Sequence, residues 1–141
     1  MEESIKIEEA IAKALKLDAV DPRTYSPLVL AYIGDAVYEL LIRTKVINHG
    51  SMQVNKMHKK SASLVKAETQ ANIIKAIQDD LTEEELAVFR RGRNAQVHSI
   101  PSHASRAQYS TATALEALFG WLYLGGQRQR ASDLFDVMME E

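Results

Sequence analysis

Two acidic side chains lie in stretches that are otherwise apolar, and they are the strongest candidates for chemistry. Asp35 lies in the run YIGDAVYE (residues 32–39), and Glu116 lies in the run ATALEALFG (residues 112–120). Both runs have the composition of helices. Aspartate is unfavourable inside a helix because its short side chain competes for backbone groups, and an internal glycine costs about 1 kcal/mol relative to alanine. Gly34 and Asp35 together therefore indicate a place where another backbone or a ligand comes close.

Small residues accompany both acids at helical spacing. Ala112, Glu116 and Gly120 recur every four residues, so a neighbouring helix could approach this strip closely. If that neighbour carries Gly34 and Asp35, two carboxylates meet in a narrow, partly dry place, where their like charges require a cation. Mg²⁺ prefers oxygen ligands and is commonly bound through one or two carboxylates next to a substrate phosphate. The residues thus indicate magnesium-assisted cleavage of a phosphodiester.

A purely structural interpretation of the same acids stays open at this point. Asp35 could pair with an arginine inside the fold, and Glu116 could be a surface residue, because structural ion pairs use the same residue types as active sites. Glu39 follows Asp35 by four residues and shares its face, but a helical glutamate is more often solvated or salt-bridged than bound to a metal. The spacing alone does not decide between these interpretations.

Two basic segments could bind a polyanion, although the net charge is only −2. Residues 43–75 carry seven Lys and Arg against one Glu, and residues 86–130 carry six Arg against one Glu. The candidate RNA-binding residues are Lys56, His58, Lys59, Lys60, Arg90, Arg91, Arg93 and Asn94. Ammonium and guanidinium groups bind phosphates, and spaced clusters suit the shallow minor groove of double-stranded RNA. Solvated lysines and arginines at a helix C-terminus are the structural alternatives.

Composition narrows the class of protein. The chain has 141 residues, of which 46% are apolar and 26% are charged, as in one folded domain. It has no cysteine, which excludes a disulfide-stapled secreted module, a thiolate zinc site and a cysteine nucleophile. The four histidines do not have the spacing of a zinc site. Since no signal peptide and no membrane span can be recognised, we expect a cytoplasmic protein without membrane contact.

Apolar residues recur with a helical period almost everywhere, which predicts an all-α fold. The expected helices cover residues 5–15, 26–47, one or two helices within 54–79, residues 82–92, 105–124, and a last helix that begins at Ser132 or Asp133. Within 26–47 the expected buried stripe consists of Val29, Ile33, Val37, Leu40 and Thr44. Residues 93–103 are expected to form a loop. We expect an N-terminal extension over residues 1–21 and a single catalytic domain over residues 22–141.

Several motifs, in this order along the chain, resemble the catalytic domain of ribonuclease III. The segment LAYIGDAVYEL (residues 30–40) resembles the signature helix of that family, and ALEALFG (residues 114–120) resembles its second acidic motif. The segments HKKS (58–61), RGRNA (91–95) and YST (109–111) resemble the compact bacterial branch, Mini-ribonuclease III, which has no double-stranded-RNA-binding domain. The resemblance covers roughly residues 26–125.

The resemblance implies a ribonuclease III-like helical bundle that forms a homodimer. It implies an endonuclease that cuts double-stranded RNA with Mg²⁺ and leaves a 5′-phosphate and a 3′-hydroxyl. Asp35 and Glu116 match the acids of the two motifs and would be the catalytic and metal-binding residues. The implied substrate is precursor large-subunit (23S) ribosomal RNA, and a large-subunit ribosomal protein is an implied partner. The full-size family has further acids where this chain has Leu28, Ala31 and Thr113, a departure that the compact branch shares.

Two other functions compete with the nuclease. A non-catalytic RNA-binding or ribosome-assembly module could keep this fold after losing three acids. A helical protein-interaction dimer would instead show no salt-dependent affinity for RNA.

Overall fold

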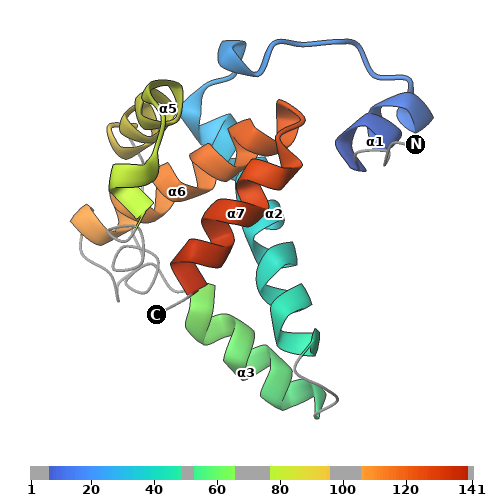
Figure 1. Ribbon diagram of the computed structural model, residues 1–141, viewed down its shortest axis with the longest axis vertical. Coiled ribbons are helices and arrows are strands. Elements are labelled where there is room, and N and C mark those ends of the chain that lie inside the picture. The colour runs from blue at the N-terminus through green and yellow to red at the C-terminus, as the bar shows by residue number, and fades with distance from the viewer. Residues whose placement is uncertain (1–6, 49–52, 66–76, 96–105, 140–141) are drawn as a thin grey trace.

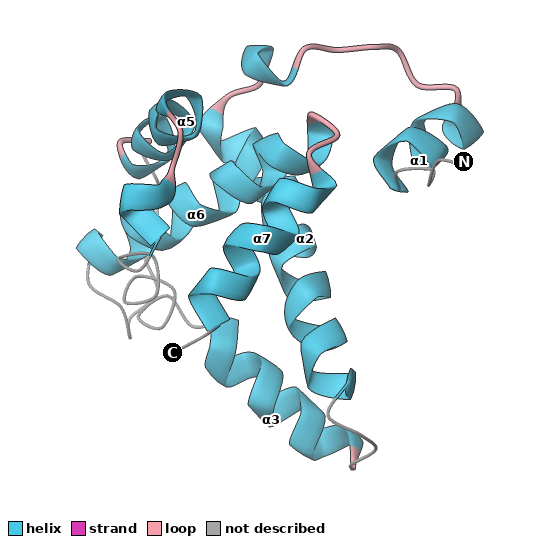
Figure 2. Ribbon diagram, in the orientation of Figure 1, coloured by secondary structure: helices cyan, strands magenta, loops and turns pink. Residues whose placement is uncertain are grey.

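The computed structural model of the protein describes residues 7–48, 53–65, 77–95 and 106–139, and these residues form helices and connecting turns without any strand (Figure 2). The elements are α1 (Ile7–Leu15), η1 (Pro22–Thr24), α2 (Pro27–Asn48), α3 (Val54–Val65), η2 (Gln78–Asp80), α5 (Glu83–Arg93), α6 (Arg106–Leu124) and α7 (Arg128–Met139). The prediction of an all-α fold is confirmed. Most of the expected loop at 93–103 and part of the expected helical stretch at 54–79 lie outside the described residues.

The centre of the fold is the crossing of α2 and α6 (Figure 1). Helices α5 and α7 pack against α6, and α3 packs against α2. The side chains of α6 are the most deeply buried in the described part of the chain, and six of them have no exposed surface: Ala114, Leu115, Ala117, Leu118, Phe119 and Leu122. Among the described residues, no helix is both long enough and apolar enough to cross a bilayer.

The buried stripe of α2 differs from the expected one. The residues that face α6 and the core recur every four positions: Leu30, Gly34, Tyr38, Ile42 and Val46. The expected stripe is wrong, because Val29 and Leu40 are 48% and 59% exposed and Thr44 is exposed as well. Apolar side chains lie on two faces of α2, so the helical period could not select the face that packs. The stripe that is buried contains the glycine.

Two glycines let the backbones of α2 and α6 touch. A Cβ at Gly34 would overlap the carbonyl oxygen of Glu116 and lie 2.6 Å from its carbonyl carbon. A Cβ at Gly120 would overlap the carbonyl oxygen of Leu30 and lie 2.9 Å from its carbonyl carbon. A glycine also allows a close backbone contact between α5 and α6, since a Cβ at Gly92 would lie 2.8 Å from the Cα of Ala114. The prediction that Gly34 marks a close approach is therefore confirmed.

The helices expected to begin at residues 26 and 82 both begin there with a cap, whereas the last helix does not begin where it was expected. The Ser26 hydroxyl accepts a hydrogen bond from the Val29 amide at 3.3 Å, and Thr82 and Glu85 form a reciprocal capping box at the start of α5. The third prediction is wrong, because α7 begins at Arg128 and not at Ser132 or Asp133. Its first turn is fixed by a tertiary contact that no capping signal could reveal.

That tertiary contact joins α7 to the start of α5. Arg130 donates from Nε and Nη2 to the two carboxylate oxygens of Glu85, at 2.8 and 2.7 Å, and also to the carbonyl of Asp80 at 2.7 Å. Burial of Glu85 alone would raise the pKa of its carboxyl, but the hydrogen bonds from Arg130 and from the Thr82 amide outweigh burial and lower that pKa. The ion pair therefore holds two helices that flank α6.

The N-terminal helix α1 lies apart from the bundle and is joined to it by an extended segment (Figure 1). Its apolar residues Ile11 and Leu15 are 40% and 63% exposed. The segment that follows ends in η1, where the Asp21 side chain caps the amide of Arg23. α1 contributes little to the core.

We predict that Gly34→Ala destabilises the fold. Helix propensity alone would stabilise the variant by about 1 kcal/mol. The added Cβ instead collides with backbone atoms of Glu116, and such overpacking costs about 1–3 kcal/mol or more. Urea unfolding followed by circular dichroism measures the difference. A Gly34→Ala protein more stable than wild type would show that the two helices do not cross at this glycine.

Candidate active site

Asp35 and Glu116 meet where α2 and α6 cross. Asp35 follows directly after Gly34, and Gly34 lies against the backbone of Glu116, so the glycine contact brings the two acids together. Both residues line one open pocket of about 610 Å³. Its lining consists of Leu28, Ala31, Tyr32, Ile33, Asp35, Ala36, Glu39, Tyr109, Thr113 and Glu116. Two acids that are distant in the sequence thus share a single site.

The two carboxyl groups interact directly. Burial is the largest cause that raises the pKa of Glu116, and the negative charge of Asp35 and a hydrogen bond with its side chain add to it, so that the pKa reaches about 8. Asp35 itself is exposed to solvent. A partly buried carboxyl next to a second one needs either a proton or a cation to offset the repulsion. The site therefore has the electrostatics of a cation-binding pocket.

The structural interpretation of these acids is wrong for the described part of the chain. The ion pairs found there are Asp21 with Arg23, Glu39 with Arg43, and Glu85 with Arg130. None of them involves Asp35 or Glu116, and Glu116 is not a surface residue. Glu39 does line the pocket, but its carboxylate accepts a hydrogen bond from Arg43 Nε at 3.0 Å. Among the described residues, the arginine on this part of α2 pairs with Glu39 and not with Asp35.

The donor set fits a hard cation that keeps part of its water shell. Among the residues that the structure describes, no group of three or more His, Cys, Asp or Glu side chains is arranged to bind a metal, so a transition-metal cage is not formed there. Mg²⁺ needs no such cage, because one or two carboxylates with waters and substrate oxygens complete its shell. Asp35 and Glu116 could supply those two carboxylates, because both line the same open pocket.

Three further positions of the pocket hold neutral residues where the full-size family is expected to have acids. Leu28, Ala31 and Thr113 are the positions at which the resemblance places additional acids in the full-size family, and all three line this pocket. Thr113 is buried, and its hydroxyl donates to the carbonyl of Tyr109 at 3.0 Å. The surroundings of the two carboxylates are therefore mostly apolar.

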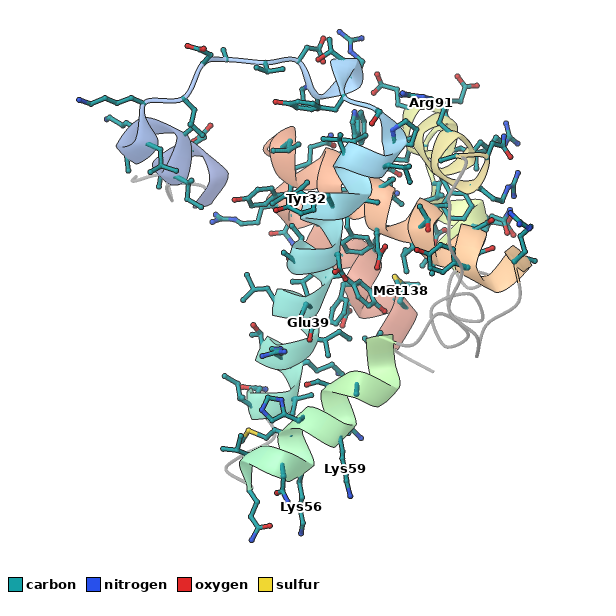
Figure 3. The ribbon with its side chains drawn as sticks, turned by 180° about the vertical axis from the view of Figure 1, so that it is seen from behind. Tyr32, Glu39, Lys56, Lys59, Arg91 and Met138 are labelled. Atoms are coloured by element: carbon teal, nitrogen blue, oxygen red, sulfur yellow. The ribbon has the colours of Figure 1, made fainter. Side chains whose placement is uncertain are left out.

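The candidate RNA-binding residues form two separate clusters, at the two ends of α2. Lys56 and Lys59 point away from α3 at one end of the molecule, and Arg91 lies at the other end (Figure 3). All of these candidates are exposed: Lys56, His58, Lys59 and Lys60 on α3, and Arg90, Arg91, Arg93 and Asn94 at the end of α5. α2 has 22 residues and is thus about 33 Å long. The acidic pocket lies on α2 between the clusters.

Two of the arginines also have contacts inside the protein. Arg91 donates from Nη2 to the carbonyl of Tyr25 at 3.4 Å, just before α2 begins. The guanidinium of Arg93 lies 5.9 Å from the centre of the Phe89 ring. Both guanidinium groups remain exposed to solvent.

Sequence reasoning missed two tyrosines of the pocket. Tyr109 lies seven positions before Glu116 and four before Thr113, so the three share one face of α6. Tyr32 lies three positions before Asp35, and it is 83% exposed. Each tyrosine could have been placed at the site from its helical spacing to an acid. The charged residues alone do not indicate it.

We predict that the metal-free protein loses stability as the pH rises from about 4.5 to about 8. Unfolded Glu116 ionises near its ordinary pKa of 4.5, whereas the folded protein retains that proton up to about 8, so over this interval the unfolded state binds fewer protons. Thermal unfolding in EDTA measures the loss, which Glu116→Gln should remove. A matched Glu39→Gln variant should keep the wild-type pH dependence. If Glu116→Gln also keeps it, the carboxyl pair does not set the effect.

Known proteins agree with this geometry. The ribonuclease III domain family model matches residues 28–127. The chain is 44% identical to Mini-ribonuclease 3 of Symbiobacterium thermophilum over 117 residues. This alignment covers 83% of this chain and 90% of that protein. It is 44% identical over 115 residues to Mini-ribonuclease 3 of Thermoanaerobacter sp., covering 82% of this chain and 81% of that one.

A solved structure agrees as well. The crystal structure of a protein from Fusobacterium nucleatum superposes with a TM-score of 0.78 at 32% sequence identity, over 85% of this chain and 96% of that one. The helical fold, the matched domain and these relatives coincide over the segment that carries both acids. The chain therefore belongs to the ribonuclease III family of double-stranded-RNA endoribonucleases.

Proposed function

We propose that this protein hydrolyses double-stranded RNA at the pocket between α2 and α6, with Asp35 and Glu116 as the ligands of a Mg²⁺ ion. The observation that supports the proposal most is the pair of interacting carboxyl groups, in one open pocket, within a ribonuclease III domain. Both acids are present, which favours an enzyme over a non-catalytic RNA-binding module of the same fold.

The residues of the chain have separate tasks in this reaction. When Mg²⁺ is bound, it supplies positive charge that stabilises the phosphodiester oxygens and favours the ionisation of water. Asp35 and Glu116 bind and orient the ion, and Glu116 must lose its proton to do so. The apolar neighbours Leu28 and Ala31 limit the number of waters around the carboxylates. Glu39 is paired with Arg43 and is not assigned to the ion.

The two basic clusters would hold the duplex on either side of the pocket. A rigid duplex that lies along α2 can contact the lysines of α3 and the arginines of α5 at the same time, because both sets are exposed. Contacts of this kind fix position and register without reading the base sequence. We therefore assign Lys56, His58, Lys59 and Lys60, together with Arg90, Arg91, Arg93 and Asn94, to RNA binding.

A homodimer would supply one active site for each strand of the duplex. Support comes from α2, whose outer face exposes large apolar side chains: Leu28, Val29, Tyr32 and Leu40 are between 42% and 83% exposed. Exposed apolar side chains that form a ridge are typical of a surface that another chain covers. Burial of this ridge against its symmetry mate would remove it from water.

The proposed substrate is precursor 23S ribosomal RNA in the cytoplasm. The proposed partner is a large-subunit ribosomal protein that presents the duplex to the enzyme. This assignment rests on the resemblance to the compact branch and on relatives named Mini-ribonuclease 3. We assign residues 22–141 to the catalytic domain and residues 1–21 to an N-terminal extension. The separation of α1 from the bundle is consistent with that division.

We predict that Asp35→Asn and Glu116→Gln each lower the rate of duplex cleavage at least a hundredfold. Both changes are nearly isosteric and remove a charged ligand of the ion, so the fold and the affinity for RNA should persist. Cleavage of a long RNA duplex with Mg²⁺ measures the rate, and a filter-binding assay measures affinity. Glu39→Gln is the matched control and should retain cleavage within about threefold, because Glu39 is already paired with Arg43. Undiminished cleavage by Asp35→Asn would end the catalytic assignment.

We predict that loss of either basic cluster weakens duplex binding and makes it less dependent on salt. Each phosphate contact contributes about 0.7–0.9 to the slope of log affinity against log salt. Lys56→Ala with Lys59→Ala, and Arg90→Ala with Arg93→Ala, should each reduce the slope by about 1–2. Lys13→Ala, an exposed lysine of α1, should leave the slope unchanged. An unchanged slope in both double variants would contradict the assignment of these clusters.

A further inference from the structure

One hydroxyl of the pocket is set apart by its position, that of Tyr109. Three hydroxyl side chains line the pocket: Tyr32, Tyr109 and Thr113. Thr113 uses its hydroxyl as a donor to the carbonyl of Tyr109, inside its own helix. Tyr32 is 83% exposed on α2. Tyr109 is half-buried, and among the described residues its hydroxyl has no hydrogen-bond partner.

The charged groups of the pocket cannot by themselves distinguish RNA from DNA, whereas a neutral hydroxyl can. Its ionisable lining consists of the carboxylates of Asp35, Glu39 and Glu116, without any lysine or arginine. These groups, with a bound cation, can act on the phosphodiester of RNA or of DNA alike. A duplex is distinguished as RNA through its 2′-hydroxyls, which act as both donors and acceptors. A tyrosine hydroxyl has the same dual capacity.

The helix geometry separates Tyr109 from the two acids along α6. Tyr109 lies seven residues before Glu116 on the same face of α6, about 10 Å along the helix axis. Helical side chains lean toward the N-terminus, which carries the Tyr109 side chain further from Glu116. The hydroxyl is thus within reach of the sugar of a neighbouring nucleotide when a phosphate lies at the two acids.

We propose that the Tyr109 hydroxyl binds a ribose 2′-hydroxyl next to the scissile phosphate, and so contributes to the selection of RNA over DNA. The proposal rests on cleavage at the Asp35 and Glu116 pocket. It assigns to Tyr109 a contact with substrate, separate from the binding of the ion.

Paired changes in the protein and the substrate test this contact. Tyr109→Phe removes only the hydroxyl, and a set of duplexes carries a single 2′-deoxy substitution at successive nucleotides around the cut. On the all-ribose duplex, Tyr109→Phe should lower kcat/KM about fivefold to tenfold, as expected for one neutral hydrogen bond. At one position, the 2′-deoxy substitution should lower the wild-type value by the same factor and leave the Tyr109→Phe value unchanged. Equal losses for both proteins at every position would overturn the proposal.

A binding measurement without metal gives a second readout. In EDTA, Tyr109→Phe should weaken binding of an RNA duplex about fivefold and leave binding of a DNA duplex of the same sequence unchanged. A loss for both duplexes would show that the hydroxyl contacts phosphate, which overturns the proposal. A loss for neither duplex would overturn it too. Urea unfolding verifies that the variant is as stable as wild type, and a lower stability would show that Tyr109 supports the fold instead.

Tyr32→Phe is the matched control, because it removes a hydroxyl from the other helix of the same pocket. It should show no coupling with any 2′-deoxy substitution. Coupling at Tyr32 and none at Tyr109 would assign the sugar contact to α2 and overturn the proposal. If Asp35→Asn still cleaves, the proposed active site fails, and that result is distinguishable from a failure of the Tyr109 contact.

Discussion

The direct contact between the backbones of α2 and α6 is the constraint on which the rest of the structure depends. Gly34 and Gly120 remove the side chains that would keep the helices apart, so each glycine lies against a carbonyl of the other helix. The closeness is what brings Asp35 and Glu116 into one pocket, where the charge of Asp35 helps to raise the pKa of Glu116. Ordinary helix packing separates axes by about 8–10 Å and leaves room for side chains between them. A wider crossing would bury the same core but separate the two carboxyl groups.

The close approach of the two helices also makes the ionised form of Glu116 electrostatically unfavourable. Glu116 is partly buried next to a second acid, and its raised pKa shows that its charged form is disfavoured in the absence of a cation. The surrounding core offsets this cost. Tyr38, one turn after Gly34, packs edge-on against Phe119 and Phe135, with ring centroids 5.6 and 5.8 Å apart, which joins α2, α6 and α7. The charged carboxyl pair is thus unfavourable by itself, but it lies within a well-packed core. A bound cation would relieve the repulsion between the two carboxylates.

Much of this arrangement could be predicted from local features of the sequence. The all-α class, the helix that begins at residue 82 and the close approach at Gly34 each depend on residues that are near one another in the chain or on a single unusual residue type. The buried face of α2 and the start of α7 could not be predicted. α2 has apolar side chains on opposite faces, so periodicity was ambiguous, and α7 begins where Arg130 reaches Glu85, a partner 45 residues away. For the site, the two acids could be recognised because their residue type is unusual in an apolar helix, whereas the neutral tyrosines are marked only by their helical spacing from an acid.

The two apolar faces of α2 also explain why a single helix can serve both fold and function. One face, at four-residue spacing through Gly34 and Tyr38, makes the core. The opposite face exposes Tyr32 and Leu40, which are 83% and 59% exposed. Asp35 lies between these faces and opens into the pocket, where it is solvated on one side and in contact with Glu116 on the other. Because Leu28 and Tyr32 on that outer face also line the pocket, a second chain that covered this face would border the pocket directly.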